Sequence, residues 1–155
     1  MPTSQTLREN TILALGLSRP LCVSPETSLR ETLELVRKAG VGALVVVEND
    51  RVVGILTERD VLMKVVARDV SYDRPVKDFM TPNPRTLTPD RPVTEAVAIL
   101  NREPYRHLPI VDAQGRPVGL VRMRDIIEYF AEAFPDEVLN LPPRPHQTME
   151  TPEGA

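Results

Sequence analysis

Two short segments of this sequence carry residues that could bind a polar ligand. The first, GILTERD, ends at Asp60, and the second, GLVRMRD, ends at Asp125. An aspartate that follows an apolar strand can accept hydrogen bonds from both hydroxyls of a ribose, as acidic residues do in dinucleotide sites. The hydroxyl of Thr57 would add a polar group, and the N-terminus of the adjoining helix favours phosphate. The spacing therefore indicates a pair of sites for a polyol or a nucleotide.

Helix capping is the alternative role of the same residues. Thr57 followed by Asp60 is a Thr-x-x-acid start, in which the hydroxyl caps the helix and the helix dipole favours the acid. In the second segment Arg122 replaces Thr57 and cannot cap in this way, yet Asp125 remains. Capping alone therefore explains Asp125 less well, although an acid in a first helical turn is favourable without a cap. Both interpretations stay open.

The two segments belong to a repeat that covers most of the chain. Gly40–Asp60 aligns without a gap with Tyr105–Asp125, and an offset one residue shorter aligns Pro20–Leu29 with Pro84–Val93. Because self-similarity at a fixed period marks a repeat architecture, we predict two copies of one unit. The identical pairs in the ungapped alignment are Val46/Val111, Arg51/Arg116, Val53/Val118, Gly54/Gly119, Arg59/Arg124 and Asp60/Asp125.

The residue pattern of each copy predicts the element order β-α-β-β-α. A brief strand stops at a proline, an amphipathic helix follows, and a buried strand, a polar turn and another strand lead into a second amphipathic helix. One such unit alone would leave a face of its sheet uncovered. We therefore expect an α/β fold in which two units pack through their sheets with pseudo-two-fold symmetry. The brief strands are expected at Leu21–Val23 and Arg85–Leu87, and the apolar faces of the second helices at Val61, Leu62, Val65 and Val66 and at Ile126, Ile127 and Phe130.

The repeat also divides the chain into predicted segments. These are a helical lead-in (1–18), a first domain (19–68), a linker (69–75), a second domain (76–132) and a C-terminal extension (133–155). VKDFMT, just after the linker, is predicted to add a helical turn. The extension contains LPPRPHQTMETPEGA, which is typical of an extended or disordered tail. Alternatively PPRP is a polyproline ligand, and the preceding FPDEVLNL could fold back on the domain or on a partner.

Composition limits the classes of function. The 155 residues carry a net charge of −3, so no global field attracts nucleic acid or an anionic membrane. The single cysteine excludes an internal disulfide and suits a reducing cytoplasm. The N-terminus lacks the basic region of a signal peptide, and no apolar run approaches the about 18 residues of a membrane span. We therefore expect a cytoplasmic protein without a membrane or nucleic-acid partner.

No residue pattern indicates catalysis. The sequence has no nucleophile elbow, P-loop or glycine-rich dinucleotide motif, and no pair of acids spaced for acid–base work. Cys22, in a predicted strand, is interpreted as a small buried hydrophobe rather than a reactive thiol. His107 is interpreted either as a hydrogen-bonded strand histidine or as a phosphate contact, and neither it nor His146 has metal-ligand spacing. We expect no enzyme, no metal and no required cofactor.

The two copies resemble a tandem pair of CBS (cystathionine-β-synthase-type) domains, the Bateman module, as in stand-alone CBS-domain proteins. The resemblance rests on Arg19–Leu62 and Met80–Ile127, and above all on the M-T-x-x-P lead-in, on RHLPIVD and on the closing Gly-apolar-apolar-Thr-x-x-Asp. It implies a pseudo-two-fold pair with two equivalent clefts. In the family these clefts often bind adenosine-containing ligands: AMP, ADP, ATP or S-adenosylmethionine. Two such pairs commonly dimerise into a disc.

The resemblance also assigns roles to individual residues. Asp60 and Asp125 would hold ribose hydroxyls, and Thr57 matches the family's Thr or Ser position, whereas Arg122 departs from it. Val41–Leu44 likewise departs from its RHLP counterpart in the second copy. The clefts are therefore expected to be unequal, the first with the better ribose end and the second with more cationic groups. Those groups are Arg106, His107, Arg122 and Arg124.

The remaining expected site residues surround the phosphate and the base. Arginine suits phosphate because its planar fork donates two hydrogen bonds, and Arg59 and Arg124 are expected to point across the pseudo-two-fold axis toward the other cleft. The residues expected to frame an adenine are Cys22, Val23, Thr86, Leu87, Met80 and Thr81.

These observations lead to a hypothesis about function. We expect a non-catalytic regulatory or sensing module that binds an adenosine-containing ligand, forms a homodimer and passes the signal to an unidentified effector protein. The alternative is a structural dimerisation or scaffold module with vestigial clefts, which the departures at Arg122 and at Val41–Leu44 support.

Overall fold

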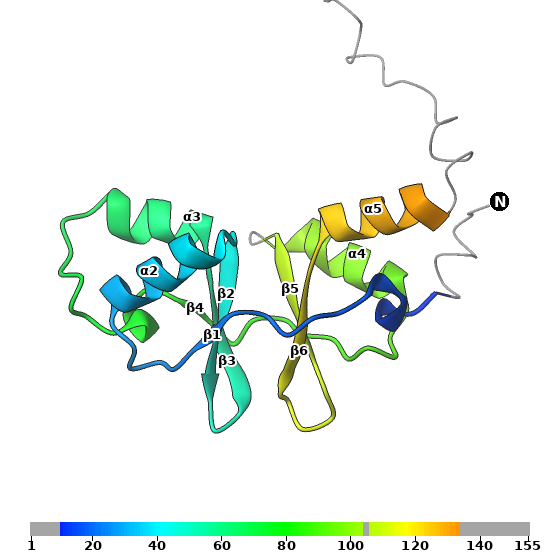
Figure 1. Cartoon of the computed structure of the whole chain (residues 1–155), viewed down its shortest axis with the longest axis horizontal. Helices are drawn as coiled ribbons and strands as arrows, with labels where there is room; N and C mark the ends of the chain where they lie inside the picture. The colour runs from blue at the N-terminus through cyan, green and yellow to red at the C-terminus, as the bar shows by residue number, and fades with distance from the viewer. Residues whose placement is uncertain (1–9, 104–105, 134–155) are drawn as a thin grey trace, which may run out of the picture.

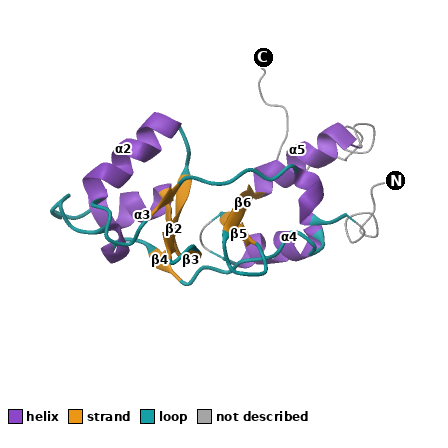
Figure 2. Ribbon diagram, turned by 60° about the horizontal axis from the view of Figure 1, so that its bottom comes forward, coloured by secondary structure: helices purple, strands orange, loops and turns teal. Residues whose placement is uncertain are grey.

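The computed structural model describes residues 10–103 and 106–133, which form two halves side by side (Figure 1). In each half the helices lie outside and the strands lie near the centre of the molecule (Figure 2). In chain order the elements are η1 (Ile12–Leu15, 3-10), β1 (Cys22–Val23), α2 (Leu29–Ala39), β2 (Ala43–Glu48), β3 (Arg51–Thr57), α3 (Glu58–Val61), η2 (Leu62–Val66, π), η3 (Val76–Asp78, 3-10), β4 (Thr81–Pro82), α4 (Val93–Arg102), β5 (His107–Val111), β6 (Pro117–Arg122) and α5 (Met123–Ala133).

The sheet of the first half has the strand order β1-β2-β3-β4. β1 runs parallel to β2, and the other pairs are antiparallel. In the second half β5 and β6 form an antiparallel hairpin, and Leu87 bridges to Ile110 in parallel, where β1 stands in the first half. The brief strand expected at Arg85–Leu87 is thus reduced to a single bridge. The predicted β-α-β-β-α repeat is confirmed.

Apolar residues on both faces of β2 and β3 explain how the halves pack. Leu44, Val46 and Leu56 belong to the core between the first sheet and its helices. Val45 and its register partner Ile55 lie on the opposite face and are fully buried. Because side chains alternate between the faces of a strand, the buried second face must be covered by something other than those helices. β3 contacts β5 of the other half, so the two sheets face each other as predicted.

The segment that precedes each repeat packs on the other repeat. Ile12 is buried in the core of the second half, and its N–H donates to the carbonyl of Arg91 at 2.9 Å. Val76 and Phe79 are buried in the core of the first half. Val76 begins the 3-10 turn Val76–Asp78, the helical turn predicted for VKDFMT. The segment predicted as a linker folds back as well, since the N–H of Leu29 donates to a carbonyl within it, that of Arg74, at 2.8 Å. The domain boundaries stay a prediction, because packing crosses them.

This exchange explains why both copies place a glycine at the same strand position. A Cβ on Gly54 would lie 2.3 Å from the sulfur of Met80, and a Cβ on Gly119 would lie 2.8 Å from Cδ2 of Leu17. A gap this small excludes a side chain unless the neighbour moves. Each glycine therefore gives space to an apolar side chain from the lead-in segment that crosses it.

Some apolar residues of the second helix of each half are exposed in the structure, although the sequence predicts that they face the core. Val65, Ile126 and Phe130 are buried, whereas Leu62 and Val66 are 58% and 65% exposed. Met63 at 57% and Ile127 at 59% are exposed too. The prediction that all the apolar residues of these helices face the core is therefore wrong for Leu62, Val66 and Ile127.

Several predictions fall on residues that the structure does not describe. The Pro-rich tail with His146, the segment FPDEVLNL, and residues 1–9 of the expected helical lead-in lie outside the described residues. The described part of the lead-in contains the 3-10 helix Ile12–Leu15. Among the helices of residues 10–103 and 106–133, none combines the length and the apolar character that crossing a bilayer requires.

Candidate functional site

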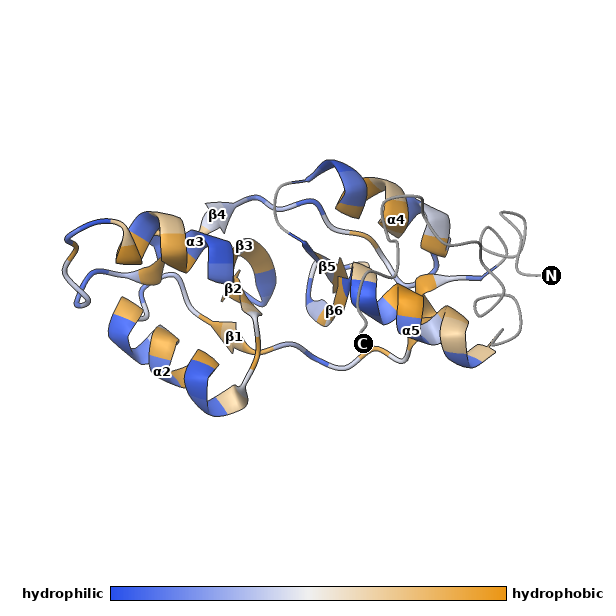
Figure 3. Cartoon of the chain, turned by 90° about the horizontal axis from the view of Figure 1, so that it is seen from above, coloured by the Kyte–Doolittle hydropathy of each residue, from blue (hydrophilic) through white to orange (hydrophobic). Residues whose placement is uncertain are grey.

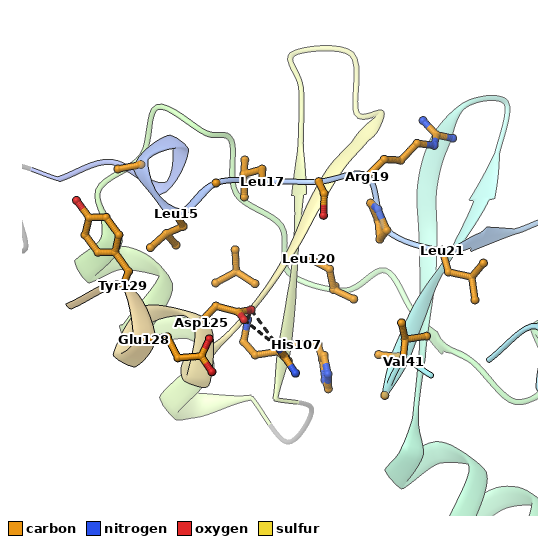
Figure 4. A pocket seen from close by; sticks show the side chains of 18 of the residues that line it. Leu15, Leu17, Arg19, Leu21, Val41, His107, Leu120, Asp125, Glu128 and Tyr129 are labelled. Atoms are coloured by element: carbon orange, nitrogen blue, oxygen red, sulfur yellow. Dashed lines mark hydrogen bonds and ion pairs between the residues drawn. The ribbon is translucent and has the colours of Figure 1, made fainter. Parts of the chain in front are cut away.

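A cavity of about 820 Å³ lies between the two halves. Its walls are the segment Ala14–Leu21, the residues Gly40–Ala43 at the start of β2, the end of β6, and one face of α5. Figure 4 shows Asp125, Glu128 and Tyr129 on α5 across from Leu15 and Leu17, with Val41 on the far side. Both halves therefore contribute to one cavity large enough for a nucleoside-sized ligand.

The segment Ala14–Leu21, which we call the strap, is fixed at both ends. At one end the Ile12–Leu15 turn is docked on the second half, and Leu17 fills the space above Gly119. At the other end the carbonyl of Leu21 accepts a hydrogen bond from the N–H of Val45 in the first half, at 3.0 Å. The cavity wall formed by the strap thus links the two repeats.

Asp125 lies at the cavity where β6 passes into α5. All three hydrogen bonds recorded for its carboxylate come from Arg122: the backbone N–H at 2.8 Å, Nη2 at 2.8 Å and Nε at 3.3 Å. Partial burial raises the pKa of Asp125, but the hydrogen bonds and charge of Arg122 outweigh it and leave the pKa below its ordinary value. The side chain is 27% exposed, so an ionised carboxylate with remaining acceptor capacity faces the cavity.

His107, the first residue of β5, lies on the same wall (Figure 4). Burial, followed by the positive charge of Arg122, lowers its pKa below the ordinary value, while Glu58 and Asp125 act in the opposite direction. Its Nδ1 is buried and has no hydrogen-bond partner among the described residues. The lowered pKa disfavours the protonated imidazole, and within the described residues Nδ1 lacks the hydrogen bond expected of a satisfied strand histidine.

Carboxylates outnumber guanidinium groups around the cavity. Asp125, Glu128 and Glu132 stand on one face of α5, against Arg19 on the strap and Arg122. Arg122 is already paired with Asp125 at 2.8 Å. Arg124, expected to point toward the other cleft, instead donates to Glu128 on its own helix at 2.9 Å, with 73% of its side chain exposed. With Asp125 and Glu128 both in ion pairs, the described residues of the cavity wall carry no excess of positive charge, in contrast to the cationic wall expected.

Asp60, the counterpart of Asp125, is surrounded differently. It forms a complete capping box with Thr57, which confirms the capping interpretation. Its Oδ2 accepts from the N–H and the hydroxyl of Thr57 at 3.0 and 3.2 Å, and its Oδ1 accepts from the Thr81 hydroxyl and from Lys64 Nζ, both at 3.1 Å. The residue is 7% exposed and lies outside the 820 Å³ cavity. Asp60 is therefore enclosed by four donors, whereas Asp125 faces the cavity.

The structure does not bring the other expected site residues to the cavity. Arg59 and Arg106 are exposed, and neither lies on the cavity wall. Cys22 in β1 is half-buried and donates its thiol hydrogen to the Pro20 carbonyl at 3.2 Å, and burial raises the pKa of the thiol. The remaining residues expected to frame an adenine lie off the cavity wall: Val23 and Leu87 in the two cores, Met80 above Gly54, Thr81 bonded to Asp60, and Thr86 half-buried in the segment before Leu87.

Sequence reasoning missed the strap, with Arg19, and the acidic face of α5. A signal for the strap was present, because continuing the upstream alignment pairs Ile12 with Val76, and both prove to be buried. The acidic face could have been read from Glu128 and Glu132, which lie three and seven residues after Asp125 and thus on its side of the helix.

The family comparison matches most of the chain. A family model described as "CBS domain" matches residues 15–67 and 76–132. A curated relative from Acidianus ambivalens, "Uncharacterized 17.7 kDa protein in bps2 3'region", is 37% identical over 113 residues, which is 72% of this chain and 68% of that protein. The match spans only 20% to 55% of the length of the curated relatives that follow it.

Solved structures of similar fold include ligand complexes. "CBS domain protein PAE2072 from Pyrobaculum aerophilum complexed with AMP" has a TM-score of 0.72 at 26% identity, covering 84% of this chain and 99% of that one. The CBS domain pair of protein MJ0100, in complex with 5'-methylthioadenosine and S-adenosyl-L-methionine, has a TM-score of 0.70 at 25% identity, covering 80% and 98%.

Proposed function

The chain belongs to the CBS domain family, and from this premise we propose that it is a non-catalytic regulatory module that binds an adenosine-containing ligand beside Asp125. The observation that carries the proposal is the 820 Å³ cavity between the repeats, with an ionised, partly exposed carboxylate on its wall. The complexes of similar structures with AMP, and with S-adenosyl-L-methionine and 5'-methylthioadenosine, support this class of ligand.

The residues of the cavity suggest how such a ligand is held. Asp125 accepts hydrogen bonds from the ribose hydroxyls. To make room for them, the partly exposed guanidinium of Arg122 moves away from the carboxylate. Arg19 on the strap offers the guanidinium for one phosphate. Glu132 adds negative charge, while Glu128 is paired with Arg124, so the cavity suits AMP or the positively charged S-adenosylmethionine better than the more anionic ADP or ATP. The ligand acts as a signal, and no further cofactor is required.

Binding at this place can be transmitted because the strap joins both repeats. A ligand that contacts the strap, β2 and α5 together stabilises one relative arrangement of the two halves over others. An effector protein that recognises this arrangement then responds to the ligand. A single free cysteine supports a reducing cytoplasm as the compartment in which this occurs.

The exposed apolar residues support a homodimer. We call Leu62, Met63, Val66 and Ile127 the apolar patch; the first three lie on η2, which continues α3, and Ile127 lies on α5. Figure 1 shows α3 and α5 on the same side of the molecule, and Figure 3 views that side. Apolar side chains gathered on one surface are typical of an interface, and Leu62 and Ile127 are repeat equivalents, which suits a symmetric partner. Light scattering should give twice the chain mass of 17.3 kDa for the wild type. The double variant Leu62→Glu/Ile127→Glu should give the mass of one chain. Leu13→Glu, an exposed site outside the patch, is the control, and a monomeric wild type would refute the dimer.

Thermal unfolding with a ligand panel tests the proposed function. AMP, ADP, ATP and S-adenosylmethionine are each added at about 1 mM, where a site with a Kd of about 10 µM stabilises the fold by about 2.7 kcal/mol. The melting temperature should rise by about 5–10 °C with AMP or S-adenosylmethionine. Asp125→Ala should abolish the rise, while the control Asp73→Ala should keep it. No rise with any ligand would refute the proposal and favour the scaffold function.

A further inference from the structure

We propose that Lys64 closes the Asp60 end of the first repeat to ligands, so that each chain binds one adenosine-containing ligand and not two. The inference rests on the proposed function and concerns the place where the repeat symmetry predicts a second site. It makes Lys64 the residue that sets the number of ligands.

The acceptor capacity of Asp60 carries the argument. A carboxylate has about four lone-pair positions. At Asp60 four donors take them: the N–H and hydroxyl of Thr57, the hydroxyl of Thr81, and the ammonium of Lys64. Two hydroxyls of a ribose would need two of these positions. Thr57 belongs to the cap of α3 and Thr81 to β4, so Lys64 is the donor that can leave without breaking a secondary-structure element.

Lys64 is also held from its other side. Its ammonium donates to the carbonyls of Phe79 and Met80 at 3.0 and 3.4 Å, in addition to Asp60 at 3.1 Å. An ammonium has three hydrogens, so these three acceptors satisfy it fully. A ligand that displaced Lys64 would leave two carbonyls without this donor and would have to replace all three interactions.

The second repeat lacks this closure. The counterpart of Lys64 in the alignment is Tyr129, whose hydroxyl donates to Asn10 at 3.1 Å and not to Asp125. The counterpart of Thr57 is Arg122, which supplies three donors to Asp125 but is itself 44% exposed and can turn away. One repeat therefore has a closed aspartate and the other an open one.

Calorimetric titration of the full chain with AMP, and separately with S-adenosylmethionine, tests the inference. The wild type should bind one ligand per chain, Asp125→Ala should bind none, and Lys64→Met, which keeps the apolar stem but removes the ammonium, should bind two. Lys38→Met, an exposed lysine at the end of α2, is the matched control and should bind one.

The outcomes separate this inference from the function on which it rests. Two ligands per wild-type chain, or binding that survives in Asp125→Ala, would overturn the closure and leave the proposed function standing. A folded Lys64→Met that still binds one ligand would overturn the role of Lys64. No binding of either ligand by any variant would overturn the proposed function and this inference together.

Discussion

Asp60 and Asp125 both end a strand and begin a helix, but their carboxylates have different surroundings. Asp60 accepts from three other residues that lie on separate elements, and its side chain is 10% exposed. Asp125 accepts from Arg122 alone among the described contacts, and its side chain is 27% exposed at a cavity. A motif repeated in sequence thus stabilises the fold in one half and, as we propose, binds the ligand in the other. Equivalent positions share a backbone role but not a function.

The largest difference should appear in stability. Asp60→Ala removes the acceptor of the Thr57 N–H and of the Thr81 hydroxyl, and it takes from Lys64 one of its three acceptors, so it should cost about 2–3 kcal/mol. Asp125→Ala breaks a pair that is partly exposed and should cost about 1 kcal/mol. Urea unfolding measures both free energies. Equal costs would mean that the burial of Asp60 does not set its role.

Ligand affinity should show the opposite order. Removing Asp125 deletes two charge-assisted hydrogen bonds to the ribose, each worth about 1.5–3 kcal/mol, so AMP affinity should fall by about a thousandfold and leave no measurable binding at about 1 mM ligand. Asp60→Asn, which keeps the shape of the buried side chain, should leave the affinity within about twofold. Titration calorimetry on both variants measures this, and a larger loss in Asp60→Asn would reverse our assignment.

The equivalent glycines Gly54 and Gly119 allow a further comparison of the two halves. Ala at Gly54 or at Gly119 would force its Cβ against Met80 or Leu17, and we expect a cost of about 1–2 kcal/mol in each case. Only Gly119→Ala should also weaken AMP binding, because Leu17 belongs to the strap at the cavity. Met80→Ala in the Gly54→Ala background should restore part of the lost stability. Equal effects of the two glycine variants on AMP affinity would show that the strap does not shape the site.

The smallest expected effect is a pH dependence that arises at the cavity. The pKa of His107 is lowered in the folded chain by burial and by Arg122, so below about pH 6.5 the unfolded chain binds a proton that the folded chain resists. Stability should therefore fall as the pH decreases from about 7 to 5.5. His107→Gln should flatten this slope. A slope that persists unchanged in His107→Gln would contradict the assignment.

Much of the fold could be predicted from the sequence, because repetition and local patterning act over short distances. The ordered match of Gly40–Asp60 with Tyr105–Asp125 was enough to predict two units, and the apolar run around Val45 predicted a buried strand. The exposure of Leu62 and Ile127 could not be predicted, since helical spacing does not show which apolar residues the rest of the chain covers.

The site was harder to predict than the fold. The environment of Asp60 depends on Lys64 one turn later and on Thr81 from the following repeat, and no local pattern brings these together. The cavity depends on the strap crossing from the second half to the first, which is a property of how the repeats exchange their lead-in segments. The lowered pKa of His107 follows from burial and from Arg122, and not from its neighbours in sequence.

A crystal structure of the full chain with AMP or S-adenosylmethionine tests the central claim most directly. We expect one ligand in the cavity, with its ribose against Asp125 and the Lys64–Asp60 contact intact. A ligand bound at Asp60, with Lys64 displaced and the cavity beside Asp125 empty, would contradict it.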